Sequence, residues 1–526
     1  MISLLHDYVS RHARAHGGDV AAVMHDRSLS YADLDETSDR LARWLVDVGC
    51  EAGDRVCLLA PKSLGSIVGI IATLKAGCVY VPLDTEAPLA RTRKMIVAVE
   101  PAAILATERT TESIADLTAG SERSPVTARV DHATDEEIRG EAEVWKEPTA
   151  ASLRPAVGVD DLAYIMFTSG STGDPKGVMI THANVSHFVE WGTSRFRMRR
   201  GDRHSGHSPL HFDLSVFDLF GTFAAGAELH LVPPEKNLIA SALVDFIRSA
   251  RLTQWFSVPT SLVQMAMHAD LDDAELPSLE RLFWCGEVLP TPVLRRWMRR
   301  FPDVEFTNLY GPTETTIASS AFTVSEPPGR DDADVPIGTA CEGEELIVLD
   351  DDLRQVAPGE VGDLYIGGVG LSPGYWRDEA KTAAAFLRHP FRGDGDERLY
   401  RTGDRAVVGA SGLVSFRGRA DTQIKSRGYR IELGDIEAAV GTLGLLGESA
   451  VVSVPSSGFE GTAICCAFVP RRSHEVPVHE LRRALAELLP SYMLPSRWRS
   501  FDELPKNANG KIDRQALKAL FERETR

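Results

Sequence analysis

Apolar residues in the N-terminal part of the chain alternate between helical spacing and short continuous runs. Apolar residues recur at helical intervals over 34–48, and a short apolar run over 56–60, ending at Pro61, predicts a buried strand. The same order returns with a helix predicted over 67–74 and a strand over 78–83. Helices and strands that alternate in this way are typical of βαβ units. We therefore predict an α/β fold built on a largely parallel sheet.

The pattern changes along the rest of the chain. The alternation returns over 185–310, whereas 109–158 is polar and predicts a surface excursion with little structure of its own. Short apolar runs broken by Gly and Pro over 335–417 predict an antiparallel or barrel-like module. From about residue 420 the composition becomes charged and Gly-containing, which predicts that a small C-terminal domain begins there.

Length and charge narrow the range of functions. The 526 residues exceed the limit of about 250 to 300 at which a single hydrophobic core stops growing, so at least two domains are expected. A formal charge of -18 repels phosphates, and we expect no nucleic-acid partner. The seven cysteines lack metal-type spacing, and the chain shows no signal-peptide or membrane-spanning apolar run. We expect a soluble cytoplasmic protein with no membrane partner.

The segment YIMFTSGSTGDPKGVMITHAN, residues 164–184, carries the clearest chemical signal. Strands predicted over 164–167 and 177–180 enclose a Ser/Thr/Gly loop whose amides and hydroxyls suit an anion such as a polyphosphate. No Gly-Lys-Ser/Thr ends the loop, so it is not the Walker loop of ordinary kinases. ATP chemistry is the first hypothesis, and a flexible surface hairpin is the alternative.

A second turn, YGPTE over 310–314, follows a strand-like run. A turn glutamate near a triphosphate favours Mg²⁺, which prefers hard oxygen ligands shared with phosphate. Alone, the same turn could be a helix N-terminus at which Glu314 interacts with the helix dipole. Only further motifs can distinguish the two interpretations.

Those motifs follow in order as YRTGD over 400–404, GRAD over 418–421 and NGKIDR over 509–514. Together with the two segments above they resemble the adenylate-forming superfamily, which includes nonribosomal peptide synthetase adenylation domains, acyl-CoA ligases and luciferase-like enzymes. The resemblance extends from about Tyr31 to Arg514. It implies an α/β protein with a large N-terminal domain of doubly wound sheets plus a small barrel-like module (1–418), and a small mobile α+β C-terminal domain (419–526).

The resemblance also implies a site for ATP. Lys176 would act with the phosphate loop on the β- and γ-phosphates, and the loop residues are Thr168, Ser169, Gly170, Ser171, Thr172 and Gly173. The other nucleotide-binding residues would be Gly286, Asn308 and Tyr310 around the adenine, Thr313 on the turn, and Asp404 and Arg419 at the ribose.

The remaining roles concern charge and motion. Glu314 would bind Mg²⁺, and Lys511 would bridge the substrate carboxylate and the α-phosphate. His211 would line the carboxylate entrance, and Asp421 matches the hinge of the family. Fixed positive charge is needed because a carboxylate must attack an ATP that repels it; one well-placed donor contributes roughly 3 kcal/mol.

The segment FDLSVF over 212–217 bears on the acid that is activated. In amino-acid-activating members the aspartate here pairs with the substrate ammonium; otherwise Asp213 would simply cap a helix. Without another charged or amide group, the pocket favours a small apolar amino acid such as alanine, although any single Phe could instead be core. Carried over by motif, the pocket is Asp213, Leu214, Phe217, Phe256, Phe283, Cys285, Leu309, Ile317 and Ala318.

The resemblance implies a second half-reaction. The loop around Lys425, Arg427 and Gly428 would be presented to a phosphopantetheine thiol after the C-terminal domain rotates. Few residues follow Arg514, so we expect a freestanding enzyme that meets an acyl or peptidyl carrier protein in trans. The chain is also similar to D-alanine:carrier protein ligases, and an acyl- or aryl-CoA ligase is the main rival. A carrier-bound amine is an alternative acceptor.

Overall fold

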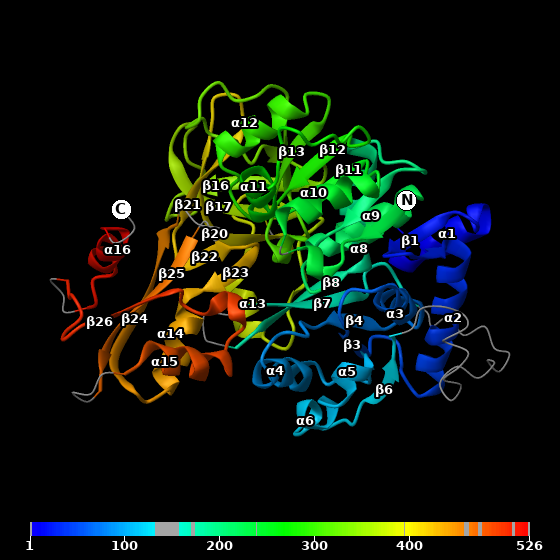
Figure 1. Ribbon diagram of the computed structural model, residues 1–526, viewed down its shortest axis with the longest axis horizontal. Helices are drawn as coiled ribbons and strands as arrows, with labels where there is room; N and C mark the ends of the chain where they lie inside the picture. The colour runs from blue at the N-terminus through cyan, green and yellow to red at the C-terminus, as the bar shows by residue number, and fades with distance from the viewer. Residues whose placement is uncertain are drawn as a thin grey trace.

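The computed structural model describes residues 3–131, 157–169, 174–237, 239–393, 395–456, 462–471, 476–507 and 511–523. The chain forms a large N-terminal part and a smaller C-terminal part, which lie on opposite sides in Figure 1. This arrangement confirms the predicted division into a large sheet domain and a small C-terminal domain. Among the described residues, no helix has both the length and the hydropathy needed to cross a bilayer.

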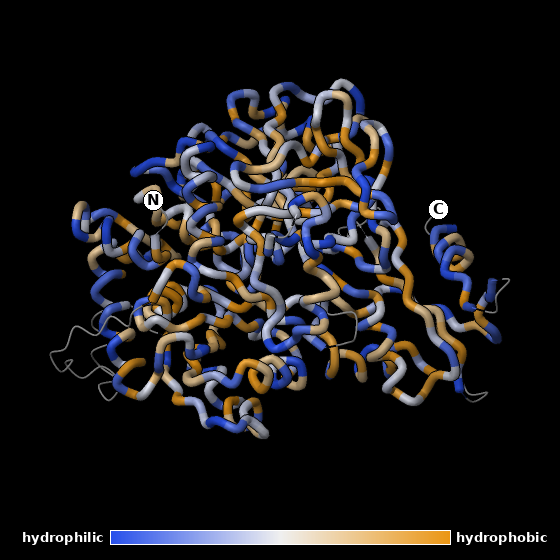
Figure 2. The backbone as a smooth tube through the Cα atoms, turned by 180° about the vertical axis from the view of Figure 1, so that it is seen from behind, coloured by the Kyte–Doolittle hydropathy of each residue, from blue (hydrophilic) through white to orange (hydrophobic). Residues whose placement is uncertain are grey.

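The first sheet has seven strands and contains the predicted βαβ units. Its order is β18 (Gly374–Tyr375), β8 (Lys176–Thr181), β7 (Leu162–Thr168), β4 (Val79–Pro82), β3 (Arg55–Leu59), β5 (Ala103–Ala106) and β6 (Val126–Arg129). β3 pairs in parallel with β4, and α3 (Leu64–Lys75) connects them. Every residue of α3 is buried, which explains why most of this helix is apolar (Figure 2).

The second sheet has nine strands. Its order is β15 (Thr339–Ala340), β14 (Ser320–Val324), β13 (Glu305–Tyr310), β12 (Arg281–Trp284), β11 (Gln254–Ser257), β9 (Arg203–Gly206), β10 (Glu228–Leu231), β1 (Val20–Met24) and β2 (Arg27–Ser30). The strands from β13 to β10 in this order are parallel. Their carboxyl ends therefore share one edge, which is where ligands bind on open α/β sheets.

Helices cover both sheets. In the N-terminal part they are α1 (Leu5–His16), α2 (Tyr31–Asp47), α3, α4 (Leu89–Val99), α5 (Glu108–Thr111), α6 (Ile114–Thr118), α8 (His182–Arg195), α9 (Leu214–Ala225), η1 (Pro234–Lys236), α10 (Ala240–Ser249), α11 (Pro259–His268), α12 (Thr291–Arg300), η2 (Thr313–Thr315) and α13 (Glu379–Ala385). α2 confirms the helix predicted from the leucine spacing; it begins at a capping box formed by Ser30 and Asp33.

An antiparallel sheet completes the N-terminal part and confirms the antiparallel module predicted over 335–417. It consists of β16 (Glu344–Leu349), β17 (Val361–Gly368), β20 (Arg398–Val408), β19 (Phe386–Arg388) and β21 (Val414–Arg419). The C-terminal part follows with the hairpin β22 (Gln423–Ser426) and β23 (Tyr429–Glu432), then α14 (Leu433–Thr442), β24 (Leu446–Pro455), β25 (Thr462–Pro470), α15 (Val478–Ala486), η3 (Ser491–Met493), β26 (Arg497–Ser500) and α16 (Arg514–Arg523).

The prediction of an excursion without structure over 109–158 is wrong in its first part. β6 pairs in parallel with β5 and forms the edge of the seven-stranded sheet, and Leu117 of α6 is buried. An edge strand needs only one paired side, so its polar sequence gave a weak strand signal. Residues 132–156 lie outside the described part of the chain.

Candidate active site

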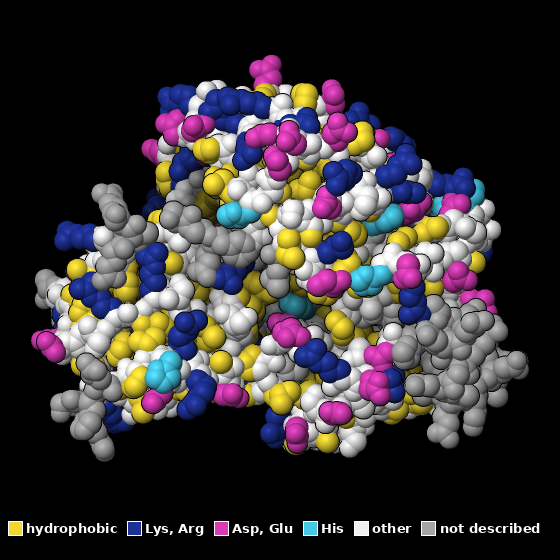
Figure 3. Space-filling view, in the orientation of Figure 1, with side chains coloured by type: hydrophobic (Ala, Val, Ile, Leu, Met, Phe, Trp, Pro, Cys, Tyr) yellow, Lys and Arg dark blue, Asp and Glu magenta, His cyan; other side chains and the backbone are white. Residues whose placement is uncertain are grey.

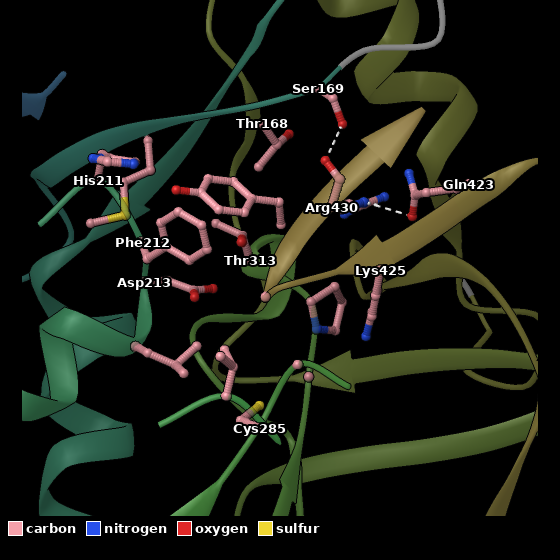
Figure 4. A pocket seen from close by; sticks show the side chains of 18 of the residues that line it. Thr168, Ser169, His211, Phe212, Asp213, Cys285, Thr313, Gln423, Lys425 and Arg430 are labelled. Carbon is pink, nitrogen blue, oxygen red and sulfur yellow. Dashed lines mark hydrogen bonds between the residues drawn. The ribbon is translucent and has the colours of Figure 1, made fainter. Parts of the chain in front are cut away.

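A cavity of about 130 Å³ lies where the N-terminal sheets meet the β22–β23 hairpin. A hollow is visible on the surface between the two parts of the molecule (Figure 3), and Figure 4 shows side chains from both parts around the cavity. The wall includes Thr168, Ser169, His211, Asp213, Leu214, Cys285, Gly286, Thr313, Asp404, Arg419, Lys425 and Arg430. The fold thus gathers segments that are far apart in the sequence.

Asp213 precedes α9 and lies in the cavity wall (Figure 4). It is 8% exposed, and burial raises the pKa of its carboxyl from 3.8 to about 6, although Thr313 partly offsets this effect. The side chain makes no capping hydrogen bond to α9, so it does not act as the helix cap that was the alternative interpretation. Among the described residues Asp213 forms no ion pair, and a buried carboxylate without a cation is an unstable arrangement that a substrate ammonium would relieve.

The other residues of the predicted amino-acid pocket fall into two groups. Leu214 and Cys285 line the cavity beside Asp213. The rest are buried in the adjoining hydrophobic core: Phe217, Phe256, Phe283, Leu309, Ile317 and Ala318. The three phenyl rings pack edge to face, with centroids 6.1 Å apart for the first pair and 6.2 Å for the second. In this structure these six side chains are core residues behind the cavity rather than its lining.

Glu314 lies on η2 and is fully buried. Its Oε1 accepts a hydrogen bond from the Tyr375 hydroxyl at 2.8 Å, and its Oε2 pairs with Arg430 Nη1 at 2.6 Å. Burial alone would raise the pKa of Glu314, but the positive charges of Arg430 and Lys176 outweigh it and lower the pKa to about 2. Glu314 is therefore ionised, as a metal-binding carboxylate must be.

The described part of the phosphate loop lies beside Glu314. Thr168 and Ser169 line the cavity, and the Ser169 hydroxyl donates to the Arg430 carbonyl at 2.6 Å. Lys176 begins β8 and places its ammonium 5.0 Å from the centre of the Tyr375 ring; burial lowers its pKa. The predicted loop residues Gly170, Ser171, Thr172 and Gly173 lie outside the described residues.

A polar network joins the antiparallel sheet to the start of the C-terminal part. Asp404 accepts hydrogen bonds from the Tyr310 hydroxyl and from Arg419. Arg419 also pairs with Asp421 at 2.7 Å, and Asp421 accepts the Gln423 amide at 3.0 Å. This network connects β13, β20 and β21 to the first residues of the hairpin. A change in position of the hairpin would therefore act on it directly.

A second cavity of about 360 Å³ adjoins the first and shares Gly286 and Lys425 with it. Asn308 and Tyr310 also line this cavity, so the residues predicted to surround the adenine lie together. Asn308 donates to the Pro336 carbonyl at 2.9 Å, which fixes its amide. The space is therefore bounded by a flat ring and a fixed amide, which are the groups that a purine base would use.

The sequence that contains these segments matches the models of a known protein family. Residues 9–376 match the family described as AMP-binding enzyme, and residues 435–511 match the AMP-binding enzyme C-terminal domain. The chain belongs to the AMP-binding enzyme family. It is an ATP-dependent, AMP-forming ligase, as the resemblance in sequence predicted.

Two relatives and one solved structure align with this AMP-binding enzyme over almost their whole length. The L-proline--[L-prolyl-carrier protein] ligase of Pseudomonas fluorescens is 33% identical over 98% of this chain and 99% of its own. The enzyme of the same name from Streptomyces coelicolor is 34% identical over 93% and 91%. The Vibrio cholerae adenylation domain AlmE, solved with glycyl-adenosine-5'-phosphate, has a TM-score of 0.84 at 26% identity and covers 99% of this chain and 98% of its own.

The structure does not bring Lys511 to the cavity. Lys511 is exposed, and its backbone amide donates to the Asn507 side chain at 3.1 Å. Instead the hairpin supplies Lys425 and Arg430 to the cavity wall. This is the arrangement that the sequence resemblance associates with the second half-reaction, in which the lysine is withdrawn and the hairpin loop is presented.

Two residues of the site were not singled out from the sequence. Arg430 and Tyr375 bind the two oxygens of Glu314. Arg430 belongs to the same charged segment as Lys425 and Gly428, which was a weak signal for a role in the site. Tyr375 lies in a Gly-containing stretch that gave no signal for a functional residue. Their importance follows from contacts across the fold.

His211 lines the first cavity and also a third one of about 350 Å³. Its Nε2 lies 4.0 Å from Asp84, and burial lowers its pKa, which favours the neutral ring. Tyr429 and Tyr492 line both cavities and stack on each other with centroids 3.5 Å apart. The third cavity therefore adjoins the reaction site at the contact between the two parts of the molecule.

Proposed function

We propose that this AMP-binding enzyme activates a small apolar amino acid as its aminoacyl adenylate and transfers the aminoacyl group to a carrier protein. The observation that carries the proposal is Asp213, a buried carboxylate in a cavity that also contains the residues predicted for ATP. An amino acid offers an ammonium for this carboxylate, whereas a fatty or aromatic acid leaves it without a cation. The resemblance to carrier protein ligases that align over nearly their whole length supports the acceptor.

Alanine is our first candidate substrate. Leu214 and Cys285, the predicted pocket residues that line the cavity beside Asp213, carry no charge or amide for a polar side chain, and the packed phenylalanines behind them limit the depth available. Proline is the second candidate, because two relatives that align over nearly their whole length carry proline in their names. The two candidates differ in size and in the number of ammonium hydrogens that can reach Asp213.

In the first half-reaction, an oxygen of the substrate carboxylate attacks the α-phosphorus of ATP and pyrophosphate leaves. We assign Thr168 to Gly173 and Lys176 to the phosphates, Asp404 and Arg419 to the ribose, and Gly286, Asn308, Tyr310 and Thr313 to the rest of the nucleotide. Glu314 would hold Mg²⁺, which supplies charge neutralisation when bound. His211 is assigned to the carboxylate entrance.

In the second half-reaction, the carrier thiol attacks the acyl carbon and AMP leaves; the amine of a carrier-bound aminoacyl group is the alternative nucleophile. The third cavity, which shares Tyr429 and Tyr492 with the reaction site, supports an approach between the two parts of the molecule. We propose that residues 419–526 rotate about Asp421 relative to residues 1–418, which exchanges Lys511 for the hairpin. We place the reaction in the cytoplasm, where seven free buried cysteines stay reduced.

The test of the substrate is pyrophosphate exchange into ATP with a panel of acids. The panel contains both enantiomers of alanine and of proline, glycine, and carboxylic acids without an amine. We expect signal with alanine and little without an amine. Signal confined to acids that lack an amine would overturn the proposal in favour of a CoA ligase. Signal with proline alone would retain the aminoacyl assignment and replace alanine.

The test of Lys511 separates the two half-reactions. We expect Lys511→Ala to abolish pyrophosphate exchange and to leave ATP binding intact, because the lysine acts on the transition state. Transfer from aminoacyl adenylate supplied in solution should persist, since Lys511 is exposed and outside the cavity when the hairpin is docked. Lys506→Ala is the matched control, because Lys506 pairs with Glu448 and Glu503 at the surface and lies outside the cavity wall. Unchanged exchange in Lys511→Ala would refute the assignment.

A further inference from the structure

A strained turn lies behind the wall of the first cavity. Thr316 and Ile317 both have a left-handed backbone, with φ of +61° and +69°. Each side chain branches at Cβ, which makes this conformation costly for both residues. No other two consecutive residues of the described chain, glycine aside, share it. Strained backbone persists only where the surroundings hold it, so neighbouring contacts must fix this turn.

The turn contacts two residues that line the first cavity. The Cys285 thiol donates to the Ile317 carbonyl, with sulfur and oxygen 3.9 Å apart. Gly311 approaches the turn so closely that a Cβ on it would lie 2.5 Å from the Cα of Ala318. Both wall residues therefore rest on the turn. A shift of the turn would move the cavity wall beside Asp213.

Two hydrogen bonds in series hold the turn from the side away from the cavity. The Thr316 hydroxyl donates to the Gly370 carbonyl at 2.7 Å, and the Gly370 amide donates to Glu344 Oε1 at 2.7 Å. Gly370 has no room for a side chain, because a Cβ would lie 2.5 Å from Glu344 Oε1 and 2.9 Å from the Thr315 carbonyl oxygen. Glu344 therefore reaches the turn through the backbone of a single glycine.

The Glu344 carboxyl acts here as an oxygen acceptor and not as a charge. Its Oε2 is buried and has no hydrogen-bond partner among the described residues. Burial raises the pKa of this carboxyl to about 8, and the Gly370 amide only partly offsets the effect. Near pH 7 the group is therefore mostly the neutral acid, which can be buried without a cation. Neither half-reaction uses it.

We propose that Glu344 is a positioning residue of the amino-acid site and acts through Gly370 on the strained turn at Thr316. The inference rests on the proposed function, because it assigns a residue to the amino-acid side of that site. Glu344 does not touch the substrate; it fixes the turn on which the wall beside Asp213 rests. ATP depends less on the turn, because the residues assigned to the ribose lie on β20 and β21.

The consequence for a variant is a difference between two KM values. Glu344→Leu removes the acceptor and leaves the buried Gly370 amide unpaired. We expect the KM for the amino acid to rise about ten-fold, the scale of one unpaired buried group, and the KM for ATP to change less than about two-fold. Glu344→Gln resembles the neutral acid and should restore the amino-acid KM. Thr316→Val removes only the hydroxyl that reaches Gly370 and should raise the same KM.

Two measurements on the full-length protein test the inference. Pyrophosphate exchange gives both KM values, with the amino acid that the wild type prefers among alanine, proline and glycine. Hydrogen–deuterium exchange of residues 315–319 is measured without any ligand. We expect the amides of the turn to exchange about ten-fold faster in Glu344→Leu and Thr316→Val than in the wild type or Glu344→Gln. The two bonds act in series, so the double variant should match the single ones rather than add their effects.

Glu345→Leu is the matched control. Glu345 follows Glu344 on β16, and its side chain lies on the opposite face of the strand. There its carboxylate pairs with His389 at 2.8 Å and with Arg392. We expect both KM values and the exchange of the turn to equal those of the wild type.

Three results would overturn the inference. One is an amino-acid KM in Glu344→Leu, or in Thr316→Val if the first variant does not fold, that equals the wild-type value. Another is an equal rise of both KM values, which would mean that Glu344 only stabilises the fold. The third is a Glu344→Gln protein that behaves like Glu344→Leu. The deuterium measurement contains no amino acid and no nucleotide. A turn that exchanges alike in all variants therefore refutes the role of Glu344 independently of the acid panel, which tests the substrate.

Discussion

Replacing Asp213 by Asn should make the protein more stable and less active at the same time. In the free enzyme the Asp213 carboxylate is buried in the cavity wall near Phe212 and Cys285 (Figure 4), and among the described residues it has a hydrogen bond with Thr313 but forms no ion pair. The uncharged amide of Asn has nearly the same shape and is less costly to bury. The substrate ammonium supplies the missing cation in the wild type and has no counter-charge in the variant.

The pKa of Asp213 sets the size of the effect on stability. The unfolded chain releases the proton near pH 3.8 and the folded chain near pH 6, so folding stability is lost as the pH rises between these values. Above pH 6 the loss is about 3 kcal/mol, because each pH unit between the two pKa values contributes about 1.4 kcal/mol. Asp213→Asn should recover up to this amount above pH 6 and little near pH 4.

The effect on activity has the opposite sign. An unpaired substrate ammonium costs about 3 to 5 kcal/mol, which lowers kcat/KM for the amino acid by at least about 100-fold. In the wild type the same pairing requires ionised Asp213, so kcat/KM should fall about ten-fold for each pH unit below 6. The variant should lack this pH dependence.

Denaturant unfolding at several pH values and pyrophosphate exchange measure the two effects on the same samples. Asp245→Asn is the control, because Asp245 is exposed on α10 and pairs with Arg248 at the surface. Equal stability of Asp213→Asn and wild type at pH 7.5 would refute the view that burial of the Asp213 carboxylate costs folding stability. An unchanged KM for the amino acid would refute its pairing with the ammonium.

Two further substitutions test the support of the site. Gly192→Ala places a Cβ 2.8 Å from the Phe217 ring, so we expect the free energy of unfolding, measured with denaturant, to fall by about 2 kcal/mol. Gly18→Ala is the control and should be tolerated, because a Cβ there meets nothing within 4 Å. Lys62 donates to the carbonyls of Gly206 and His207 at 2.6 and 2.7 Å, just before the segment that carries His211 and Asp213. Lys62→Met should raise the KM for the amino acid and cost about 2 kcal/mol of folding stability; a KM equal to wild type would contradict this positioning role.

Much of the protein followed from local sequence patterns. The leucine spacing before Gly49 and the apolar runs around Pro61 determined α2, β3 and α3, because amphipathic periodicity and turn residues act over a few positions. The order of the motifs determined the family. Asp213 was identified through the same resemblance, because the segment FDLSVF matches the place where amino-acid-activating members carry an aspartate.

Other features depend on contacts between distant segments, which periodicity does not encode. β6 became a strand because β5 offers it an edge. The phenylalanines predicted for the pocket became core because they pack on one another within the adjoining hydrophobic cluster. The arrangement of the two parts decided that Lys511 lies outside the cavity and Arg430 on Glu314. Both residues carry positive charge, and the sequence alone cannot say which of them faces the buried carboxylate, because that depends on how the C-terminal part is turned.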